Sequence, residues 1–197
     1  MDINVILFDG FTALDFVGPA EVLHRIPEFQ IRYYSVKGGL VSNGNNLTVE
    51  TERLEYMQNG ILLTPGGWGT RTAVDDNEFI AALKEKCLEA EYCLAVCTGS
   101  ALYAKTGLLD GRKATSNKKA MDWVRDVAPC VDWQYKARWV VDGKYYTSSG
   151  VSAGIDMALG FVSDRYGKEK ALEIAGTMEY IWNEDATVDL FATKHLQ

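Results

Sequence analysis

Residues 94–100 read LAVCTGS, and they place Cys97 between an apolar run and a run of small residues. The apolar run at 92–96 predicts a buried strand, and the residues that follow predict a helix at 98–104. This order is the sequence form of a nucleophile elbow, a sharp turn that lifts one side chain above the end of a sheet. A structural cysteine buried at a strand end is the alternative interpretation.

A cysteine at this junction has two sources of reactivity. The N-terminus of the following helix favours a thiolate, so we expect the pKa of Cys97 to fall. The backbone N–H groups of the turn can also hold an oxyanion. The pattern therefore indicates that Cys97 is a nucleophile.

Strands and helices alternate on both sides of this stretch. Apolar and β-branched runs predict strands at 3–8, 31–36, 47–50, 61–64, 92–96, 133–141 and 144–147. Helical patterns and capping residues predict helices at 20–25, 76–89, 98–104, 118–127, 152–166 and 168–180. The glycine- and asparagine-rich residues 37–46 predict turns. We therefore expect an α/β fold with a mostly parallel central sheet and helices on both faces.

Two further strand ends carry candidate site residues, because ligands of such folds bind beyond the carboxyl ends of the strands. Residues 65–69 read PGGWG, in which Gly66 and Gly67 let the backbone approach a ligand closely; a plain tight turn is the alternative. Asp15 lies in the apolar run FTALDFVGP at 11–19, where burial would raise its pKa and suit it to moving protons. An aspartate that caps a nearby helix is the simpler interpretation.

Residues 150–154 read GVSAG and fit the G-x-S-x-G elbow of hydrolases. Ser152, a later aspartate and His195 would match the order of a catalytic triad. However, His195 lies close to the end of the chain, where we expect fraying, and a catalytic histidine needs a fixed position. We therefore interpret Gly150 as a point of close packing or ligand approach at a helix start.

Composition limits the other functions. The chain has 197 residues, with 20 Lys and Arg against 27 Asp and Glu, and a net charge of −7. This length favours one domain over residues 1–197, and the acidic balance disfavours a nucleic-acid partner. No apolar run reaches the ~18 residues of a membrane helix, and the N-terminus has no signal-peptide pattern. The chain has no room for an appended helix-turn-helix domain, so we expect no transcription factor.

The cysteines and the remaining charges have ordinary interpretations. The four cysteines form no CxxC pair, and the chain has two histidines, so we expect no metal site. A chain of this length needs no disulfides, which favours reduced thiols and a cytoplasmic protein. We expect Lys118 and Lys119 to be exposed.

Taken together, these motifs make the chain resemble the ThiJ/PfpI superfamily, which has a class I glutamine amidotransferase-like fold. The stretches that carry the resemblance are 11–19, 64–67, 95–100, 107–115 and 149–156. Within the superfamily, the chain is most similar to the isocyanide hydratase branch. That branch pairs the elbow cysteine with an aspartate after the first strand and a threonine after the cysteine. The resemblance thus implies roles for Cys97, Asp15 and Thr98.

The resemblance also implies a flavodoxin-like three-layer sandwich, a homodimer, and an oxyanion site of backbone amides near Gly67 and Thr98. Relatives commonly have Thr-His-Trp after the stretch at 107–115, whereas here the histidine position holds Asn117. Members that use a Cys–His pair need an imidazole to take the proton of the nucleophile. The departure therefore disfavours a protease or amidase mechanism.

We expect a cofactor-free enzyme that acts on a small electrophile, which is an isocyanide converted to an N-formamide if the resemblance holds. Cys97 attacks the electrophilic carbon, and Asp15 handles the proton and orients water. Backbone amides at Gly66, Gly67 and Thr98, together with Gly150, form the binding surface. An amidase-like or glyoxalase-like enzyme is the second hypothesis. A redox-sensing or protective protein that acts through oxidation of Cys97 is the third.

Overall fold

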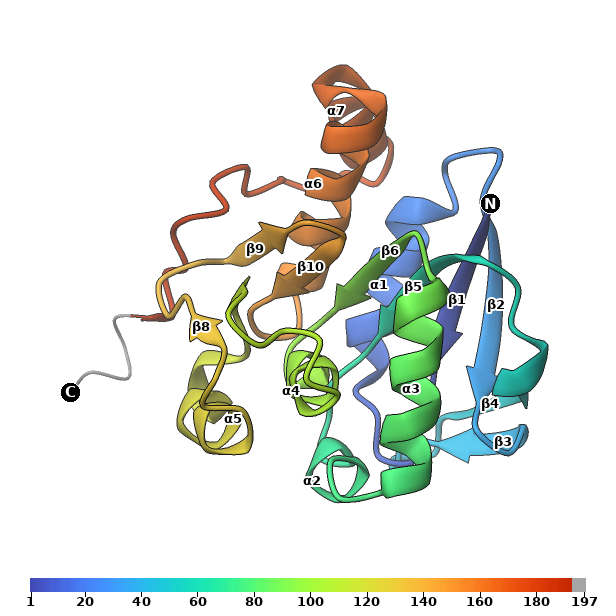
Figure 1. Ribbon diagram of the computed structural model, residues 1–197. Coiled ribbons are helices and arrows are strands. Elements are labelled where there is room, and N and C mark those ends of the chain that lie inside the picture. The colour runs from blue at the N-terminus through green and yellow to red at the C-terminus, as the bar shows by residue number, and fades with distance from the viewer. Residues whose placement is uncertain (193–197) are drawn as a thin grey trace.

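The structure, a computed structural model, describes residues 1–192. The strands of its main sheet are β1 (Asp2–Ile6), β2 (Gln30–Ser35), β3 (Gly39–Ser42), β4 (Thr48–Arg53), β5 (Gly60–Thr64), β6 (Tyr92–Ala95), β9 (Trp139–Asp142) and β10 (Tyr145–Ser148). In space they follow the order β3-β4-β2-β1-β5-β6-β10-β9 (Figure 1). The inner strands are parallel to one another, and the edge strands β3 and β9 are antiparallel to their neighbours.

Helices cover both faces of this sheet. They are α1 (Ala13–Leu23), α2 (Thr70–Ala73), α3 (Asn77–Glu89), α4 (Gly99–Lys105), α5 (Met121–Val127), α6 (Ala153–Tyr166) and α7 (Lys168–Thr177), with 3₁₀ turns η1 (Leu54–Tyr56) and η2 (Lys118–Ala120). Helices α1 and α6 pack together on one face, and α3 and α4 lie on the other (Figure 1). Short strands β7 (Lys113–Ala114) and β8 (Asp132–Trp133) form a separate parallel pair. This three-layer α/β sandwich confirms the predicted fold class.

The central strands are buried on both faces, as their continuous apolar sequences predict. Residues 61–63 of β5 and 93–95 of β6 are completely inaccessible to solvent. The two strands are in register, with Thr64 opposite Ala95 at their carboxyl ends. The chain therefore leaves β5 and β6 at the same edge of the sheet, which places Gly66 next to Cys97.

Helix α1 starts earlier than the sequence pattern predicts. It begins at Ala13 rather than at residue 20, and it contains Pro19. A proline inside a helix removes one backbone donor. Helix α1 packs closely against α6 at Gly18, where a Cβ would come within 2.7 Å of Ile155 Cγ1. Packing outweighs the local proline signal, and Asp15 consequently lies in the first turn of α1 rather than at a helix cap.

The edge of the sheet also differs from the prediction. Residues 39–42, expected to be a turn, form β3 and pair antiparallel with β4. Gly38 and Gly39 make the turn that precedes this pairing, with φ angles of 70° and 85°. The Thr51 hydroxyl then ties the strands together by donating to Gly39 O at 2.8 Å. The strand predicted at 47–50 is therefore an inner strand, β4, and β3 forms the edge.

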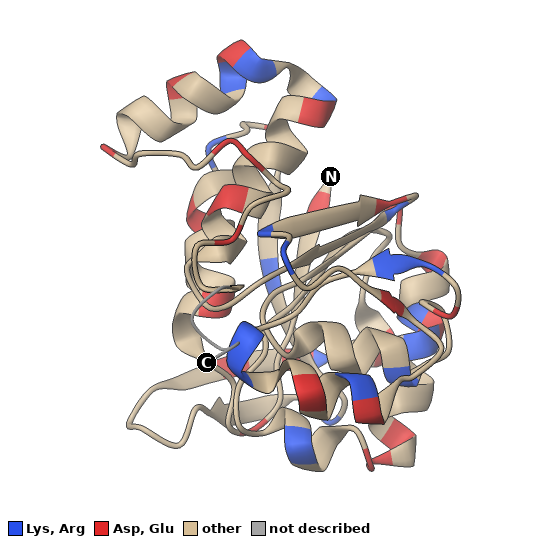
Figure 2. Ribbon diagram, turned by 90° about the vertical axis from the view of Figure 1, so that its left-hand side faces the viewer, with Lys and Arg blue, Asp and Glu red and all other residues tan. Residues whose placement is uncertain are grey.

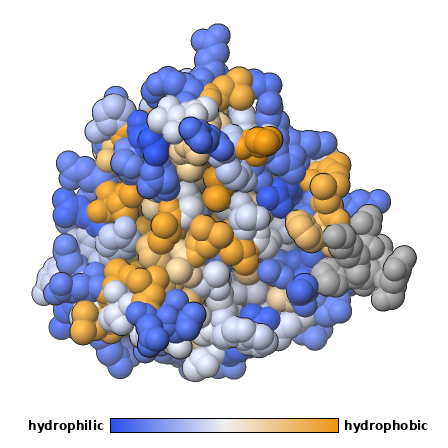
Figure 3. Space-filling model, turned by 180° about the vertical axis from the view of Figure 1, so that it is seen from behind, coloured by the Kyte–Doolittle hydropathy of each residue, from blue (hydrophilic) through white to orange (hydrophobic). Residues whose placement is uncertain are grey.

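The outer surface mixes charged and apolar side chains. Charged residues of both signs lie mainly on helices and loops (Figure 2). The rear face of the molecule shows apolar groups among hydrophilic ones (Figure 3). Leu14 and Val17 of α1 are 44% and 46% exposed. Within residues 1–192, no helix is long and apolar enough to cross a membrane.

Candidate active site

Cys97 occupies a sharp turn between β6 and α4. Its φ angle of 57° is a left-handed conformation that is uncommon for a residue with a side chain. The hydroxyls of Ser100 and Ser116 both donate to the Cys97 carbonyl at 2.9 Å. The Cys97 N–H donates to Ser149 O at 3.1 Å. These bonds hold the turn in the geometry that the sequence predicts for an elbow.

Asp15 reaches the same place from the first turn of α1. Its side chain is completely buried, and Oδ2 accepts a hydrogen bond from the Gly66 N–H at 2.9 Å. The carboxyl also interacts with the thiol of Cys97. The second oxygen, Oδ1, is buried and accepts no hydrogen bond within the part of the chain that the structure describes. One carboxyl oxygen is thus fixed, and the other is available to take a proton.

Gly66 and Thr98 pack tightly around this carboxyl. A Cβ at Gly66 would lie 2.6 Å from Thr98 N and 3.0 Å from Asp15 Oδ2, so no larger residue fits there without displacing them. The Gly67 N–H donates to Thr98 Oγ1 at 3.1 Å. The N–H groups of Gly66 and Gly67 were expected to face an oxyanion. In the structure they donate instead to the side chains of Asp15 and Thr98.

Other donors face the sulfur. Asn117 Nδ2 lies 3.3 Å from Cys97 Sγ. The backbone N–H groups of Val151 and Thr98 also bond to the thiol. Gly150 allows this approach, since a Cβ at that position would lie 2.9 Å from Asn117 Nδ2. The sequence drew attention to Asn117 and Gly150, but it gave no sign that Val151 contributes a donor.

Burial determines the acid–base properties of the Cys97–Asp15 pair. It raises the pKa of Cys97 to about 11, and the charge of Asp15 adds to this rise while the donors around the sulfur oppose it. The predicted fall in the pKa of the thiol is therefore wrong. Burial also raises the pKa of Asp15 to about 7, opposed in part by the hydrogen bond from Gly66. Asp15 can accordingly gain or lose a proton near neutral pH.

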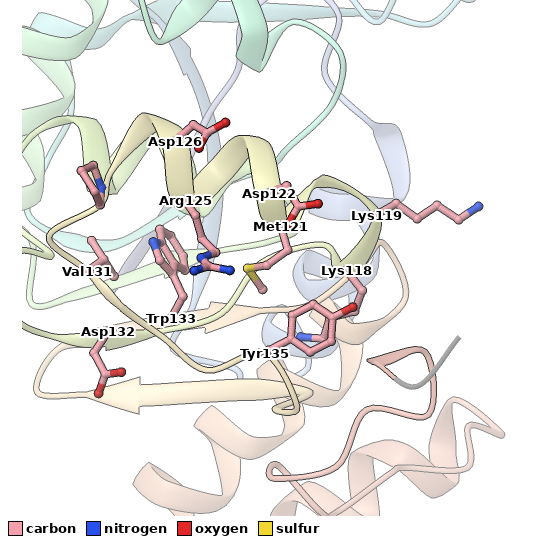
Figure 4. A pocket seen from close by; sticks show the side chains of 11 residues that line it. Lys118, Lys119, Met121, Asp122, Arg125, Asp126, Val131, Asp132, Trp133 and Tyr135 are labelled. Atoms are coloured by element: carbon pink, nitrogen blue, oxygen red, sulfur yellow. The ribbon is translucent and has the colours of Figure 1, made fainter. Parts of the chain in front are cut away.

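A small cavity of about 200 Å³ adjoins this centre. Its wall includes Asn117 and Val151, which both contact Cys97. A broader groove of about 1160 Å³ lies along α5, with Arg125 and Trp133 in its wall (Figure 4). None of the residues that bond to the sulfur lines this groove. The small cavity, unlike the groove along α5, therefore borders side chains and backbone that contact Cys97.

Lys118 is buried, which corrects the expectation that it is exposed. Only 5% of the residue is accessible. Its Nζ donates to Ala137 O at 2.7 Å and to Thr115 Oγ1 at 2.8 Å. Burial lowers the pKa of Lys118 to about 8, although the charge of Asp189 opposes this effect. The neighbouring Lys119 is exposed, as predicted.

Burial of Lys118 makes the stability of the protein depend on pH. Its pKa of about 8 lies below the ordinary 10.5, so the folded state binds fewer protons than the unfolded state between these values. Its stabilising contribution is complete above pH 10.5 and is lost as the pH falls through 8. We expect the wild type to gain about 2 kcal/mol in free energy of unfolding relative to Lys118→Met between pH 7 and about pH 9.5.

Urea unfolding of both proteins at the two pH values measures this difference. Groups that titrate equally in both proteins cancel in the comparison. Lys119→Met, which changes the exposed neighbour, is the matched control and should show no such dependence. Parallel stability curves for wild type and Lys118→Met would contradict the neutralisation of Lys118.

The serine alternative lacks the geometry of an elbow. Ser152 has an ordinary right-handed backbone, with φ of −71°, at the start of α6. Its supposed partner His195 lies outside the described residues.

The four cysteines are free thiols. Across residues 1–192, no cluster of three or more His, Cys, Asp or Glu side chains could hold a metal ion.

An α/β sandwich whose central strand ends in a strained, buried cysteine next to an aspartate defines a recognisable class of protein. The sequence profile of the DJ-1/PfpI family matches residues 1–164. The chain belongs to the DJ-1/PfpI family.

Several known proteins are similar to this chain. An isonitrile hydratase from Pseudomonas putida is 30% identical over 91% of this chain and 78% of its own length. The HTH-type transcriptional regulator CdhR of Pseudomonas aeruginosa is 28% identical over 88% of this chain, which spans 53% of that regulator. The crystal structure of a ThiJ/PfpI family protein from Pseudomonas syringae superposes with a TM-score of 0.82, at 28% identity over 91% of this chain and 74% of that one.

Proposed function

We propose that this protein is a cofactor-independent enzyme that hydrates isocyanides to N-formamides. The observation that carries the proposal is the buried Cys97–Asp15 pair, in which Asp15 has a pKa of about 7. Isonitrile is another word for isocyanide, so similarity to an isonitrile hydratase supports the substrate class. The cavity of about 200 Å³ next to Cys97 suits a small electrophile.

The reaction begins as Cys97 Sγ attacks the terminal carbon of the isocyanide. Asp15 takes the thiol proton and delivers it to that carbon, which gives a thioimidate. Water then adds to the same carbon with Asp15 as base, and the nitrogen is protonated. Cleavage of the C–S bond releases the N-formamide, and the proton returns to the sulfur. The net change is the addition of one water molecule to the isocyanide.

The donors around the sulfur support this sequence. The Asn117 amide and the N–H groups of Val151 and Thr98 face Cys97 Sγ, where negative charge develops during attack and during departure. Asp15 is held by Gly66, so its free oxygen stays oriented while it moves the proton.

A protease or amidase mechanism fits the site less well. Such a mechanism needs a base that takes the cysteine proton and passes it to the leaving amine. The side chain at 3.3 Å from Sγ is Asn117, whose amide has no basic nitrogen. His24, the histidine within the described residues, is exposed next to Glu21 at the end of α1. Asp15 can carry a proton between sulfur and carbon without a histidine.

Redox sensing is also less favoured. Oxidation by peroxide requires the thiolate. With a pKa of about 11, Cys97 is almost entirely in the thiol form at neutral pH.

The test is incubation of the purified protein with an isocyanide and detection of the N-formamide by mass spectrometry. Parallel incubations contain methylglyoxal, a simple amide, or dilute peroxide. We expect formamide in the first incubation alone. Lactate without formamide would replace the proposal with a glyoxalase-like activity, and ammonia with an amidase. Oxygen added to Cys97 without any turnover would favour the redox hypothesis.

We include the homodimer in this proposal. Leu14 and Val17 of α1, the helix that packs against α6, expose apolar surface. Self-association is one way to cover such a surface. Light scattering of the purified protein measures the oligomeric state. The cytoplasmic location, the single domain and the lack of a nucleic-acid partner stay predictions.

A further inference from the structure

Arg71 of α2 lies near the Cys97 site and forms no ion pair within the described part of the chain. Its Cζ lies 3.9 Å from the centroid of the Trp123 ring and 5.2 Å from that of Trp68. Stacking on aromatic rings fixes the plane of a guanidinium and leaves the N–H groups at its edge free to bind. Arg71 is therefore a positioned cation without an acidic partner among the residues described.

Hydroxyl groups connect Arg71 to the elbow. Arg71 Nη1 donates to Thr70 Oγ1 at 3.1 Å, and Thr70 Oγ1 lies 3.1 Å from Thr98 Oγ1. Thr98 directly follows the nucleophile. Burial lowers the pKa of Arg71, and negative charge on Cys97 opposes this effect. The guanidinium is thus close enough for its charge to act on an anion bound at Cys97.

We propose that Arg71 recognises an anionic group of the substrate, so that the preferred substrate is a small electrophile that carries a carboxylate. A guanidinium has five N–H donors, and the hydrogen bond to Thr70 occupies one of them. The others match the two oxygens of a carboxylate. Trp68 is 84% exposed and Arg71 is half-buried, so the pair borders solvent. The inference rests on the proposed role of Cys97 as the nucleophile, and it does not require that the electrophile be an isocyanide.

Alkylation of Cys97 by two matched reagents tests the inference. Iodoacetate and iodoacetamide react identically: the sulfur forms a bond to carbon, iodide leaves, and the thiol proton passes to Asp15 or to buffer. The two reagents have similar size, but only iodoacetate is negatively charged. Rates at Cys97 are followed by peptide mass spectrometry for wild type and Arg71→Gln. The exposed Cys130 reports the intrinsic preference of the reagents in each sample.

We expect Arg71→Gln to slow alkylation by iodoacetate about tenfold, which corresponds to the loss of one hydrogen bond between charged groups. Alkylation by iodoacetamide should change less than twofold. Arg71→Lys should keep part of the preference, because it retains the charge but not the forked donors. Arg125→Gln removes the same charge from the groove of Figure 4 and is the control that should leave both rates unchanged.

Equal changes for both reagents would overturn the inference, since they would show that Arg71 acts on the thiol of Cys97 or on the fold and not on the carboxylate of the reagent. A Cys97 that reacts with neither reagent would also overturn it, because the site would then not admit a small anion. A second comparison uses isocyanoacetate and its methyl ester as substrates, with a higher kcat/KM expected for isocyanoacetate in the wild type only. If neither isocyanide is converted, the proposed hydratase activity fails, while the alkylation rates still decide the role of Arg71.

Discussion

Replacement of Cys97 by alanine is expected to abolish the conversion of isocyanide to N-formamide, lowering kcat by more than about 10⁴-fold. Every covalent step of the proposed reaction passes through the sulfur, and Asp15 alone has no nucleophile to activate. The measurement is the steady-state rate of formamide formation, quantified by mass spectrometry at substrate concentrations above KM. Cys97→Ser should also be inactive, because Asp15 is too weak a base for an alcohol.

A matched variant separates loss of chemistry from loss of structure. Cys130→Ala removes an exposed thiol and should keep full activity. The urea midpoint of Cys97→Ala shows whether the elbow still folds, since its turn is held by bonds to the main chain of residue 97 rather than to the sulfur. A folded Cys97→Ala protein that retains a tenth or more of the wild-type rate would remove Cys97 from the mechanism.

The layered fold could be predicted because its central strands are buried on both faces. The apolar runs that became β5 and β6 have no other way to bury their side chains, so local sequence and tertiary structure agree. The start of α1 could not be predicted in the same way. Pro19 signals a helix start locally, but packing of Gly18 against Ile155 of α6 places it inside the helix.

The site was predictable where residues follow strands and less so where they come from elsewhere. Cys97, Gly66 and Asp15 meet because their strands end at one edge of the sheet. Val151 contributes a backbone N–H group. Almost any residue at that position could do the same, so the sequence does not reveal this role. Lys118 is buried with its Nζ bonded to Ala137 O and Thr115 Oγ1, although two consecutive lysines are typical of an exposed surface.

The pKa of Cys97 shows how two physical effects compete. A helix N-terminus and nearby N–H groups favour the thiolate, which is the effect that the sequence reveals. Burial favours the neutral thiol, and burial depends on the whole fold. Here burial outweighs the donors, and the charge of Asp15 adds to it. The elbow therefore holds Cys97 as a protonated thiol next to its base, Asp15, rather than as a thiolate.

Asp15→Asn is expected to lower kcat by about 10²-fold or more, because an amide cannot accept the thiol proton. The pH profile distinguishes this role from a structural one. Asp15 acts as a base only when ionised, so kcat/KM of the wild type should rise up to about pH 7 and then level off. The variant should lack this rise. A wild-type profile that is flat from pH 5 to pH 8 would show that Asp15 does not titrate in the reaction.

The same substitution should stabilise the fold at alkaline pH. The pKa of Asp15 is about 7 in the folded state against 3.8 ordinarily, so the folded protein retains a proton that the unfolded chain releases. The stability this provides is complete below pH 3.8 and is lost as the pH rises through 7. Asparagine keeps an acceptor for the Gly66 N–H but carries no charge to bury. Asp15→Asn should therefore gain about 3 kcal/mol relative to the wild type between pH 4.5 and about pH 8.

Urea unfolding at these two pH values measures the gain, and Asp9→Asn, a change to an exposed aspartate, is the control. A variant that is slower but more stable at pH 8 would show that the protein gives up stability to keep an ionisable carboxyl beside Cys97. Such a cost has no structural benefit, because asparagine satisfies the same Gly66 N–H. A gain that is the same at both pH values would mean instead that the carboxyl is buried without being neutralised.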